Sequence, residues 1–422
     1  MLVDSLHVLV DSLHTLVDSL RILVDYLTML VDSHSYLVDF HTNMIDYLHM
    51  LVFLKKIYIK NNSKMEGICY NIENLILIKK GGINLISKPR LKSYQLLAYE
   101  ALYRKLKKEY KDNEVFLQDY RKYYAGYLGE KRVDYTLSNF REEKIFIIKD
   151  LRLKNHNNYF QIDTLLITPY NLVILEIKNF KGELRYDSLQ KQFTQNADGK
   201  KTVYKDPIQQ ANTQKRNLAY WLQNFSLNLP IDTLVISSNP ATSIHNIQED
   251  PQIYNQFIHS ESIHFHLERI FKGYSENRLN YSSQNKLYKL LLSHHQPFTP
   301  NLMEYYKIPP DFLISGVPCE KCTDVVMHKR KNKWICPGCK RNSTSAHRQI
   351  ILDYFLLFKN TITNMECRQL LNISSPRSAY LLIKGMNLKY TGDNRARKYF
   401  APPIESYPQD NGIPFTSNHI FL

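Results

Sequence analysis

The pattern of apolar and polar positions is most regular between residues 160 and 179. Two apolar runs, FQIDTLLI and LVILEIKN, are separated by turn-forming residues, which predicts a β-hairpin. The second run carries Glu176 and Lys178, and a strand directs residues two apart to the same face. Asp163 lies on the neighbouring strand. Each charge alone is more simply an exposed residue or a surface cross-strand pair. Their combination on an apolar hairpin favours a chemical site.

Helices and a further strand are predicted around this hairpin. Residues 91–123 are rich in Leu, Tyr, Lys and Glu at helical spacing, without Gly or Pro. Glu130 follows a glycine-rich turn at the start of another predicted helix. Pro207 suits the first turn of a helix that carries Gln210. Further predicted elements are a buried strand at 232–238 and helices at about 265–273 and 284–293. Together these elements indicate an α/β fold.

The first 54 residues repeat a seven-residue unit that begins LVDSLHV. Leucine or methionine recurs at every seventh position from Leu2 to Met44, which predicts a coiled coil that would make the chain a dimer. His34 and His41 interrupt the second apolar row, and no Lys–Glu pairs fix a register. So regular a repeat is also expected when a tandem DNA repeat is translated in frame.

A second interpretation of this region is that residues 1–84 are not native. KKGG at 79–82 is what a purine-rich ribosome-binding sequence gives when it is translated, and Leu85 follows at a suitable distance for a start. On this interpretation the native protein begins at Leu85, and the predicted linker at 55–84 is not native either. A genuine coiled-coil dimer stays the alternative.

Four cysteines occur in two CxxC pairs, CEKC and CPGC, with thirteen residues between the pairs. Two such pairs on facing hairpins place four thiolates tetrahedrally around Zn²⁺. Four cysteine ligands leave no open coordination position, so the zinc is expected to be structural. Two disulfides or a redox-active CxxC are the alternatives. The predicted zinc ribbon covers residues 318–342, and its ligands would be Cys319, Cys322, Cys336 and Cys339.

A predicted linker at 296–317 precedes the ribbon, and a predicted tail at 403–422 ends the chain. Between them, residues 346–402 contain an amphipathic helix, two shorter helices and a basic hairpin with Gly-Asp-Asn at its tip. This order is typical of a winged helix that binds DNA, although three short helices can also form a protein-docking module. Candidate nucleic-acid-binding residues are Arg377 and Lys384 on the second short helix, and Arg395, Arg397 and Lys398 on the hairpin.

The charge of the chain supports a polyanionic partner. The 422 residues carry a formal net charge of +15. The first 54 contain seven Asp and one Arg, so their net charge is −6 and the remainder carries +21. A chain of this length favours two or three domains. The chain has no uninterrupted run of about 18 apolar residues, so no membrane span is predicted. The paired cysteines are typical of metal sites in a reducing compartment. We therefore expect a cytoplasmic protein.

The hairpin offers the groups that phosphodiester cleavage needs. Mg²⁺ takes one or two carboxylates, such as Asp163 and Glu176, and keeps several waters. A bound metal polarises the phosphate and lowers the pKa of a coordinated water. Lys178 would orient that water and offset charge on the phosphorane. Glu130 would complete the metal shell, and the Gln210 amide would position a water or a strand phosphate.

At these residues the sequence resembles the nuclease-related domain, within the PD-(D/E)xK nuclease superfamily. The matching motifs are GE at 129–130, QID at 161–163, EIKN at 176–179 followed by Gly182, and PIQQA at 207–211. The likeness covers residues 88–225 and continues more weakly through LPIDTLVISSNP. Asp206 departs from the family, which more often has Asn before this proline. The expected domain covers residues 126–295, after a helical lead-in at 85–125.

The resemblance implies a restriction-endonuclease-like fold, with a mixed central sheet flanked by helices. It makes Asp163 and Glu176 metal ligands and Lys178 the catalytic lysine, with Glu130 and Gln210 in support. The expected function is a bacterial Mg²⁺- or Mn²⁺-dependent nuclease that acts on DNA. A catalytically silent nucleic-acid-binding scaffold is the alternative, and the intact catalytic set argues against it. An assembly protein that uses the N-terminal repeat is a third class.

Overall fold

The structure is a computed structural model that describes residues 86–87, 90–138, 145–410 and 412–414. All of them belong to one compact unit of the chain, Gly82–Leu422. The expected heptad repeat at 1–54, the linker at 55–84 and the expected start at Leu85 lie outside the described residues.

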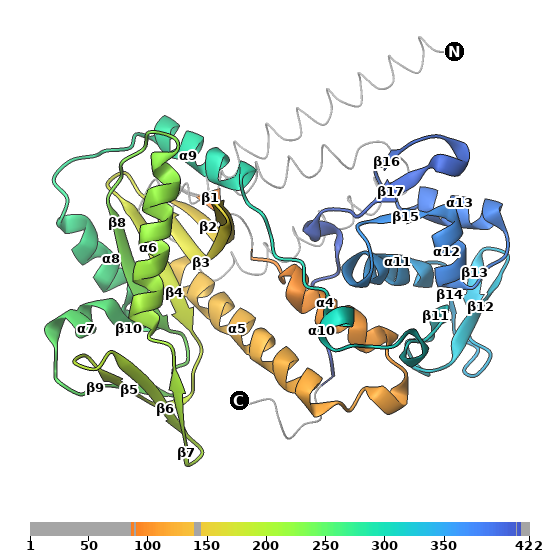
Figure 1. The fold of residues 1–422 in the computed structure, drawn as a ribbon, viewed down its shortest axis with the longest axis horizontal. Coiled ribbons are helices and arrows are strands. Elements are labelled where there is room, and N and C mark those ends of the chain that lie inside the picture. The colour runs from red at the N-terminus through yellow and green to blue at the C-terminus, as the bar shows by residue number, and fades with distance from the viewer. Residues whose placement is uncertain (1–85, 88–89, 139–144, 411, 415–422) are drawn as a thin grey trace, which may run out of the picture. The chain divides into compact units, whose positions relative to one another are not determined.

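A six-stranded mixed sheet forms the core of the nuclease-like part, in the order β1-β2-β3-β4-β8-β10 (Figure 1). Its strands are β1 (Ile86–Ser87), β2 (Phe146–Asn155), β3 (Asn158–Ile167), β4 (Leu172–Lys178), β8 (Ile231–Ser237) and β10 (Phe257–His259). Strand β3 is antiparallel to both of its neighbours, β2 and β4, whereas β8 runs parallel to β4 and to β10. The predicted hairpin is confirmed as β3 and β4, and the predicted strand at 232–238 corresponds to β8.

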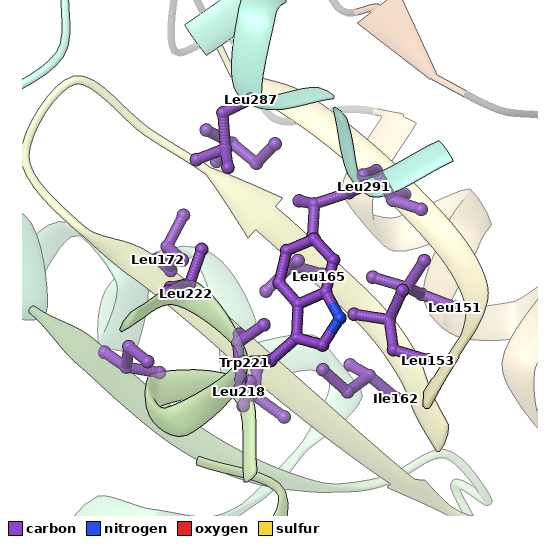
Figure 2. Close-up of a cluster of buried hydrophobic side chains, with 14 of the residues drawn as sticks. Leu151, Leu153, Ile162, Leu165, Leu172, Leu218, Trp221, Leu222, Leu287 and Leu291 are labelled. Atoms are coloured by element: carbon purple, nitrogen blue, oxygen red, sulfur yellow. The ribbon is translucent and has the colours of Figure 1, made fainter. Parts of the chain in front are cut away.

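Helices cover both faces of this sheet and make three layers. On one face, α6 (Pro207–Gln223) and α9 (Tyr281–Ser293) pack on β2, β3 and β4. Figure 2 shows Trp221 of α6 at the centre of this cluster, between leucines of α6, α9 and the strands. On the other face lie α5 (Glu114–Ser138) and α8 (Ile263–Lys272). The expected mixed sheet flanked by helices is therefore present, and the expected helices near 265–273 and 284–293 are α8 and α9.

Helices are present over the residues 91–123 that were predicted to be helical, but the glycine-rich turn predicted after them is absent. Helix α4 (Tyr94–Lys105) and the short helix η1 (Lys108–Tyr110) precede α5. The predicted glycine-rich turn before Glu130 does not exist, because Gly126 and Gly129 both lie inside α5. A Cβ atom on Gly129 would lie 2.5 Å from the Cβ of Asn179. This glycine thus lets the helix approach the end of β4 closely.

A second sheet follows the β3–β4 hairpin, in the order β7-β6-β5-β9. Its strands are β5 (Gly182–Asp187), β6 (Gln192–Ala197), β7 (Lys200–Tyr204) and β9 (Thr242–Asn246), and the helix α7 (Pro251–Gln256) comes after them. Tyr186 and Phe193 of this sheet pack with Ile208 at the start of α6. The second sheet therefore supports the beginning of the helix that carries Gln210.

The last third of the described chain contains short strands and helices. Helix α10 (Leu302–Tyr305) and the turn η3 (Pro310–Phe312) lie in the expected linker. An antiparallel sheet follows, made of β11 (Val317–Pro318), β12 (Val326–Arg330), β13 (Lys333–Ile335) and β14 (Asn342–Ser343). The four expected zinc ligands lie in the loops that follow β11 and β13.

The C-terminal elements follow in the order that a winged helix requires. They are α11 (Ala346–Leu357), β15 (Thr361–Thr363), α12 (Asn364–Leu371), α13 (Pro376–Lys384), β16 (Tyr390–Thr391) and β17 (Lys398–Phe400). The three strands form one sheet in the order β15-β17-β16. Helices and a hairpin are thus confirmed here, and the winged-helix assignment stays a prediction. Among the described helices, none combines the length and apolar character that a membrane span requires.

Candidate functional site

The β3–β4 hairpin carries three of the predicted catalytic residues, Asp163, Glu176 and Lys178. The last paired residues of its ladder are Thr164 and Leu175, and Asp163 lies one residue beyond them. The Asp163 Oδ2 accepts a hydrogen bond of 2.9 Å from the backbone N–H of Ile177. The carboxylate therefore turns along the end of β4, toward the strand that carries Glu176.

Glu176 and Lys178 form a close ion pair at the edge of the core. The Lys178 Nζ lies 2.7 Å from the Glu176 Oε1. The exposed fraction of the side chain is 21% for Lys178 and 1% for Glu176. Nζ also donates a hydrogen bond of 3.0 Å to the Oε1 of Gln210 on α6. A surface cross-strand pair is excluded, because Glu176 is almost fully buried.

Gln214 is a site residue that the sequence analysis missed. Its Nε2 donates a hydrogen bond of 2.6 Å to the Glu176 Oε2. Its own Oε1 is buried, with no hydrogen-bond partner among the described residues. The available signal was the spacing from Gln210, because residues four apart lie on the same face of a helix. An unpartnered buried carbonyl oxygen beside Glu176 is suited to accept a hydrogen bond from a water.

The start of α6 is fixed by Asp206, the position at which the sequence was expected to depart from the resembled family. One carboxylate oxygen accepts hydrogen bonds from the N–H groups of Ile208 and Gln209, at 2.8 and 3.2 Å. The other accepts a hydrogen bond of 2.8 Å from the hydroxyl group of Tyr186. Both Asp and Asn serve as N-caps. The departure thus preserves the helix start that positions Gln210.

Glu130 approaches the hairpin from α5, and its Oε2 lies 2.5 Å from the Nη1 of Arg90. Burial raises the pKa of Glu130 to about 7; Arg90 opposes this shift, whereas Asp150 and Asp134 add to it. Arg90, like Gln214, was not identified from the sequence.

Asp163 lies in a similarly negative environment. Burial raises its pKa well above the ordinary range, and the carboxylates of Glu176 and Glu130 raise it further. Lys178 and the N–H of Ile177 oppose this shift. A bound cation would offset the concentrated negative charge that these carboxylates share.

The three carboxylates that were predicted to bind metal do not bring their oxygen atoms together on one point. Within the described residues, the only His, Cys, Asp or Glu side chains whose ligand atoms converge on one point are the four cysteines. Mg²⁺ needs only one or two carboxylates, because it keeps several of its waters. One or two of Asp163, Glu176 and Glu130 would therefore be enough to hold such an ion, and waters would complete its shell.

The four cysteines fit a tetrahedral zinc ion. All four Sγ atoms lie within 4.8 Å of one another. Cys319 is 3.6 Å from Cys339, and Cys336 is 3.8 Å from Cys322. Four ligands at the Zn–S distance of about 2.3 Å would be separated by about 3.8 Å. The alternative of two disulfides is not observed, because all four cysteines are free.

The structure separates the basic C-terminal residues into two groups. Arg377 and Lys384 on α13, and Arg395 and Lys398 on the hairpin, are exposed. Arg397 is only half-exposed, and its guanidinium group lies 4.4 Å from the centre of the Tyr390 ring. Arg397 therefore packs within the hairpin, and the other four residues are available to a partner.

Comparisons with known proteins agree with the location of the candidate site. Residues 125–238 match the family model of the nuclease-related domain, and this segment contains Glu130, Asp163, Glu176, Lys178 and Gln210. No curated protein matches the chain.

Among solved structures, the crystal structure of protein VC1899 from Vibrio cholerae is similar at 9% sequence identity, with a TM-score of 0.21. The match covers 39% of this chain and 36% of that chain, so it spans little more than a third of that protein. A TM-score this low carries no argument about the fold. The core that holds the candidate site is thus similar, over residues 125–238, to the nuclease-related domain family.

Proposed function

We propose that this chain is a metal-dependent nuclease of the PD-(D/E)xK type, which hydrolyses phosphodiester bonds in DNA. The observation that supports it best is the position of Lys178. Its ammonium group lies between Glu176 and Gln210, next to the strand that carries Asp163. A half-buried lysine among carboxylates has little structural value, but it suits catalysis at a phosphate.

The carboxylates of Asp163, Glu176 and Glu130 would hold Mg²⁺ or Mn²⁺. When bound, such an ion lowers the pKa of a coordinated water and polarises a phosphate oxygen. Gln214 fixes the orientation of Glu176 by its hydrogen bond to Oε2. The buried side chains around Glu176 thus keep its carboxylate, a proposed metal ligand, in place before the substrate binds.

Lys178 has one N–H group left that can donate a hydrogen bond during the reaction. An ammonium group donates three hydrogen bonds, and Lys178 directs two of them to Glu176 and Gln210. The third can orient the attacking water or a phosphate oxygen. The positive charge of Lys178 would also stabilise the negative charge that develops on the phosphorane. The exposed amide of Gln210 would contact the strand on the solvent side.

The C-terminal part would deliver the nucleic acid. The cysteine site would hold a structural Zn²⁺, and residues 346–402 would form a winged helix. Its exposed Arg377, Lys384, Arg395 and Lys398 would contact phosphates of the DNA backbone. Four thiolates are stable in a reducing compartment, so we place the activity in the cytoplasm, in a bacterial cell.

A catalytically silent nucleic-acid-binding scaffold is the second candidate function. One observation favours it: both carboxylate oxygens of Glu176 already accept hydrogen bonds, from Lys178 and from Gln214. A metal ion must share or displace one of these donors. The two functions therefore differ in whether a divalent ion binds at Glu176.

Cleavage of labelled double-stranded DNA, single-stranded DNA and RNA tests the proposal. Each substrate is incubated with Mg²⁺ or Mn²⁺ and, in parallel, with EDTA. Cleavage of DNA that requires the metal would support the nuclease and identify its preferred strand form. Binding of DNA without cleavage under either metal would support the scaffold instead.

A further inference from the structure

Arg90 is a buried charged residue that lies before the segment matching the nuclease-related family. It follows β1 in sequence and precedes α4. Only 2% of its side chain is exposed. A guanidinium group has no acceptor of its own and must find partners for its donors when buried. Those partners show what Arg90 holds in place.

All three guanidinium nitrogens of Arg90 donate to residues at the candidate metal site. Nη1 lies 2.5 Å from the Glu130 Oε2. Nε and Nη2 donate to the two carboxylate oxygens of Asp134, at 2.8 and 3.3 Å. Nη2 also lies 3.2 Å from the backbone oxygen of Asp163 and 2.8 Å from the Oγ1 of Thr164. One side chain thus joins α5 to the strand that carries Asp163.

The two carboxylates on α5 require such a partner. Glu130 and Asp134 are four residues apart, so they lie on the same face of the helix and repel each other. The planar guanidinium group of Arg90 donates two hydrogen bonds to Asp134 and a third to Glu130. A lysine offers a point charge and cannot reproduce this planar arrangement.

Stability alone is a poor reason to keep Arg90. Burying a guanidinium group and two carboxylates carries a desolvation penalty, and well-packed apolar residues are often at least as stable in such positions. Arg90 occupies one oxygen of Glu130 and, among the described residues, no other side chain bonds the second. The second oxygen is the one available to a metal ion.

We propose that Arg90 is a positioning residue of the nuclease site. It fixes Glu130 relative to Asp163, so that the two carboxylates can bind the same divalent cation. This inference rests on the proposed function, because it assumes that Glu130 and Asp163 bind metal.

Mn²⁺ binding to the zinc-loaded full chain tests the inference without using catalysis. The free ion is followed by its electron paramagnetic resonance signal, and Asp163→Asn defines the Mn²⁺ that binds elsewhere. Losing a residue that orients a metal ligand typically weakens metal affinity 10–100-fold, so we expect a loss of that order for Arg90→Met and for Glu130→Gln. Because Arg90 acts through Glu130, the double variant should bind Mn²⁺ no more weakly than Glu130→Gln alone.

Lys92→Met is the matched control. Lys92 lies two residues further along the same segment, and its Nζ forms a buried ion pair with Glu100 at 2.7 Å. We expect this variant to melt at a lower temperature and to keep the Mn²⁺ affinity of the wild type. If Arg90→Met also melts at a lower temperature and keeps the Mn²⁺ affinity, Arg90 serves only stability and the inference is overturned. It is equally overturned if Arg90→Met weakens binding by the same factor with and without Glu130→Gln.

Two further results keep the outcomes distinct. If Arg90→Met does not fold, Arg90→Lys retains the charge without the planar guanidinium group, and it must show the same loss of affinity. Wild type that binds no more Mn²⁺ than Asp163→Asn would overturn the metal-dependent nuclease itself, and with it the role of Arg90. Wild type that binds Mn²⁺ through Glu130, with Arg90→Lys and Arg90→Met unaffected, would overturn the Arg90 inference alone.

Discussion

Gln214 donates a 2.6 Å hydrogen bond to the Oε2 of Glu176, from one turn beyond Gln210 on α6. Gln210 accepts a hydrogen bond from Lys178, which also pairs with the other carboxylate oxygen of Glu176. The four side chains therefore form a continuous hydrogen-bonded chain between α6 and β4. Two glutamines on one helix face set the orientation of both charged residues on the strand.

Removing the Gln214 amide should leave a buried carboxylate oxygen of Glu176 without its partner. Loss of such a partner lowers stability by about 1–3 kcal/mol, so we expect Gln214→Ala to lower the free energy of unfolding by that amount in urea denaturation. Gln209→Ala, on the exposed side of the same helix, should change it by less than about 0.5 kcal/mol. Equal effects of the two variants would show that the Gln214–Glu176 hydrogen bond contributes nothing.

The cysteine site should hold about one zinc ion per chain, since four thiolates complete a tetrahedral shell. Replacing Cys336 by serine removes one thiolate, and we expect the zinc content measured by atomic absorption to fall to near zero. Cys367→Ala is the control, because Cys367 is buried in the same apolar cluster but does not belong to the four-cysteine group. Loss of zinc from the control, or its retention in Cys336→Ser, would contradict the assignment.

Glu366 makes the stability of the C-terminal part depend on pH. It closes a capping box with Thr363 at the start of α12. Burial raises its pKa, but hydrogen bonds from Lys359 and Thr363 outweigh burial and lower the pKa to about 2 from an ordinary 4.5. A pKa that is lower in the folded state stabilises the fold above the unfolded pKa. This contribution is present above pH 4.5 and is lost as the pH falls toward 2.

Glu366→Gln removes the titrating group and should reveal this window. We expect wild type to exceed the variant in unfolding free energy at pH 7, and the difference to shrink as the pH is lowered below 4.5. Chemical denaturation of both proteins at matched pH values measures it, and zinc loss at low pH affects both alike. A difference that stays constant from pH 7 to pH 3 would contradict the assigned ion pair.

The basic hairpin should contribute to the salt dependence of DNA binding. Each neutralised phosphate adds about 0.9 to the slope of log affinity against log salt concentration. Arg395→Ala with Lys398→Ala should therefore lower the slope by up to about 1.8. Arg397 is left intact, because it packs against Tyr390. Lys272→Ala with Lys286→Ala, exposed on α8 and α9, should lower it less, and equal slopes in all proteins would exclude the hairpin as a DNA contact.

Much of the fold could be predicted from local sequence patterns. The alternation that predicted the hairpin and Pro207 at the start of α6 both act over a few residues, and both are confirmed. Gly129 misled the interpretation, because glycine is as useful for close packing as for a turn. Its neighbours at the contact, Asn179 and Ser238, are distant in sequence, so no local pattern shows the packing.

The candidate site was predicted only in part for the same reason. Glu176 and Lys178 are two residues apart on one strand, and their proximity follows from the period of a strand. Arg90 contacts residues 40 and 44 positions along the chain. An isolated arginine before a helix carries no signal that it will be buried between two carboxylates. Partners that come from different elements become visible only when the fold is known.

Single-turnover cleavage by wild type, Lys178→Ala and Lys181→Ala tests the central claim most directly. All three proteins act on the preferred substrate with Mg²⁺ or Mn²⁺ and with EDTA. Lys181 lies three residues beyond Lys178, is half-buried and pairs with Asp198, and it is not part of the hydrogen-bonded chain. We expect metal-dependent cleavage by wild type and Lys181→Ala, and a rate about 10²–10³ lower for Lys178→Ala. Cleavage by Lys178→Ala at the wild-type rate would contradict the account, as would an absence of metal-dependent cleavage by the wild type.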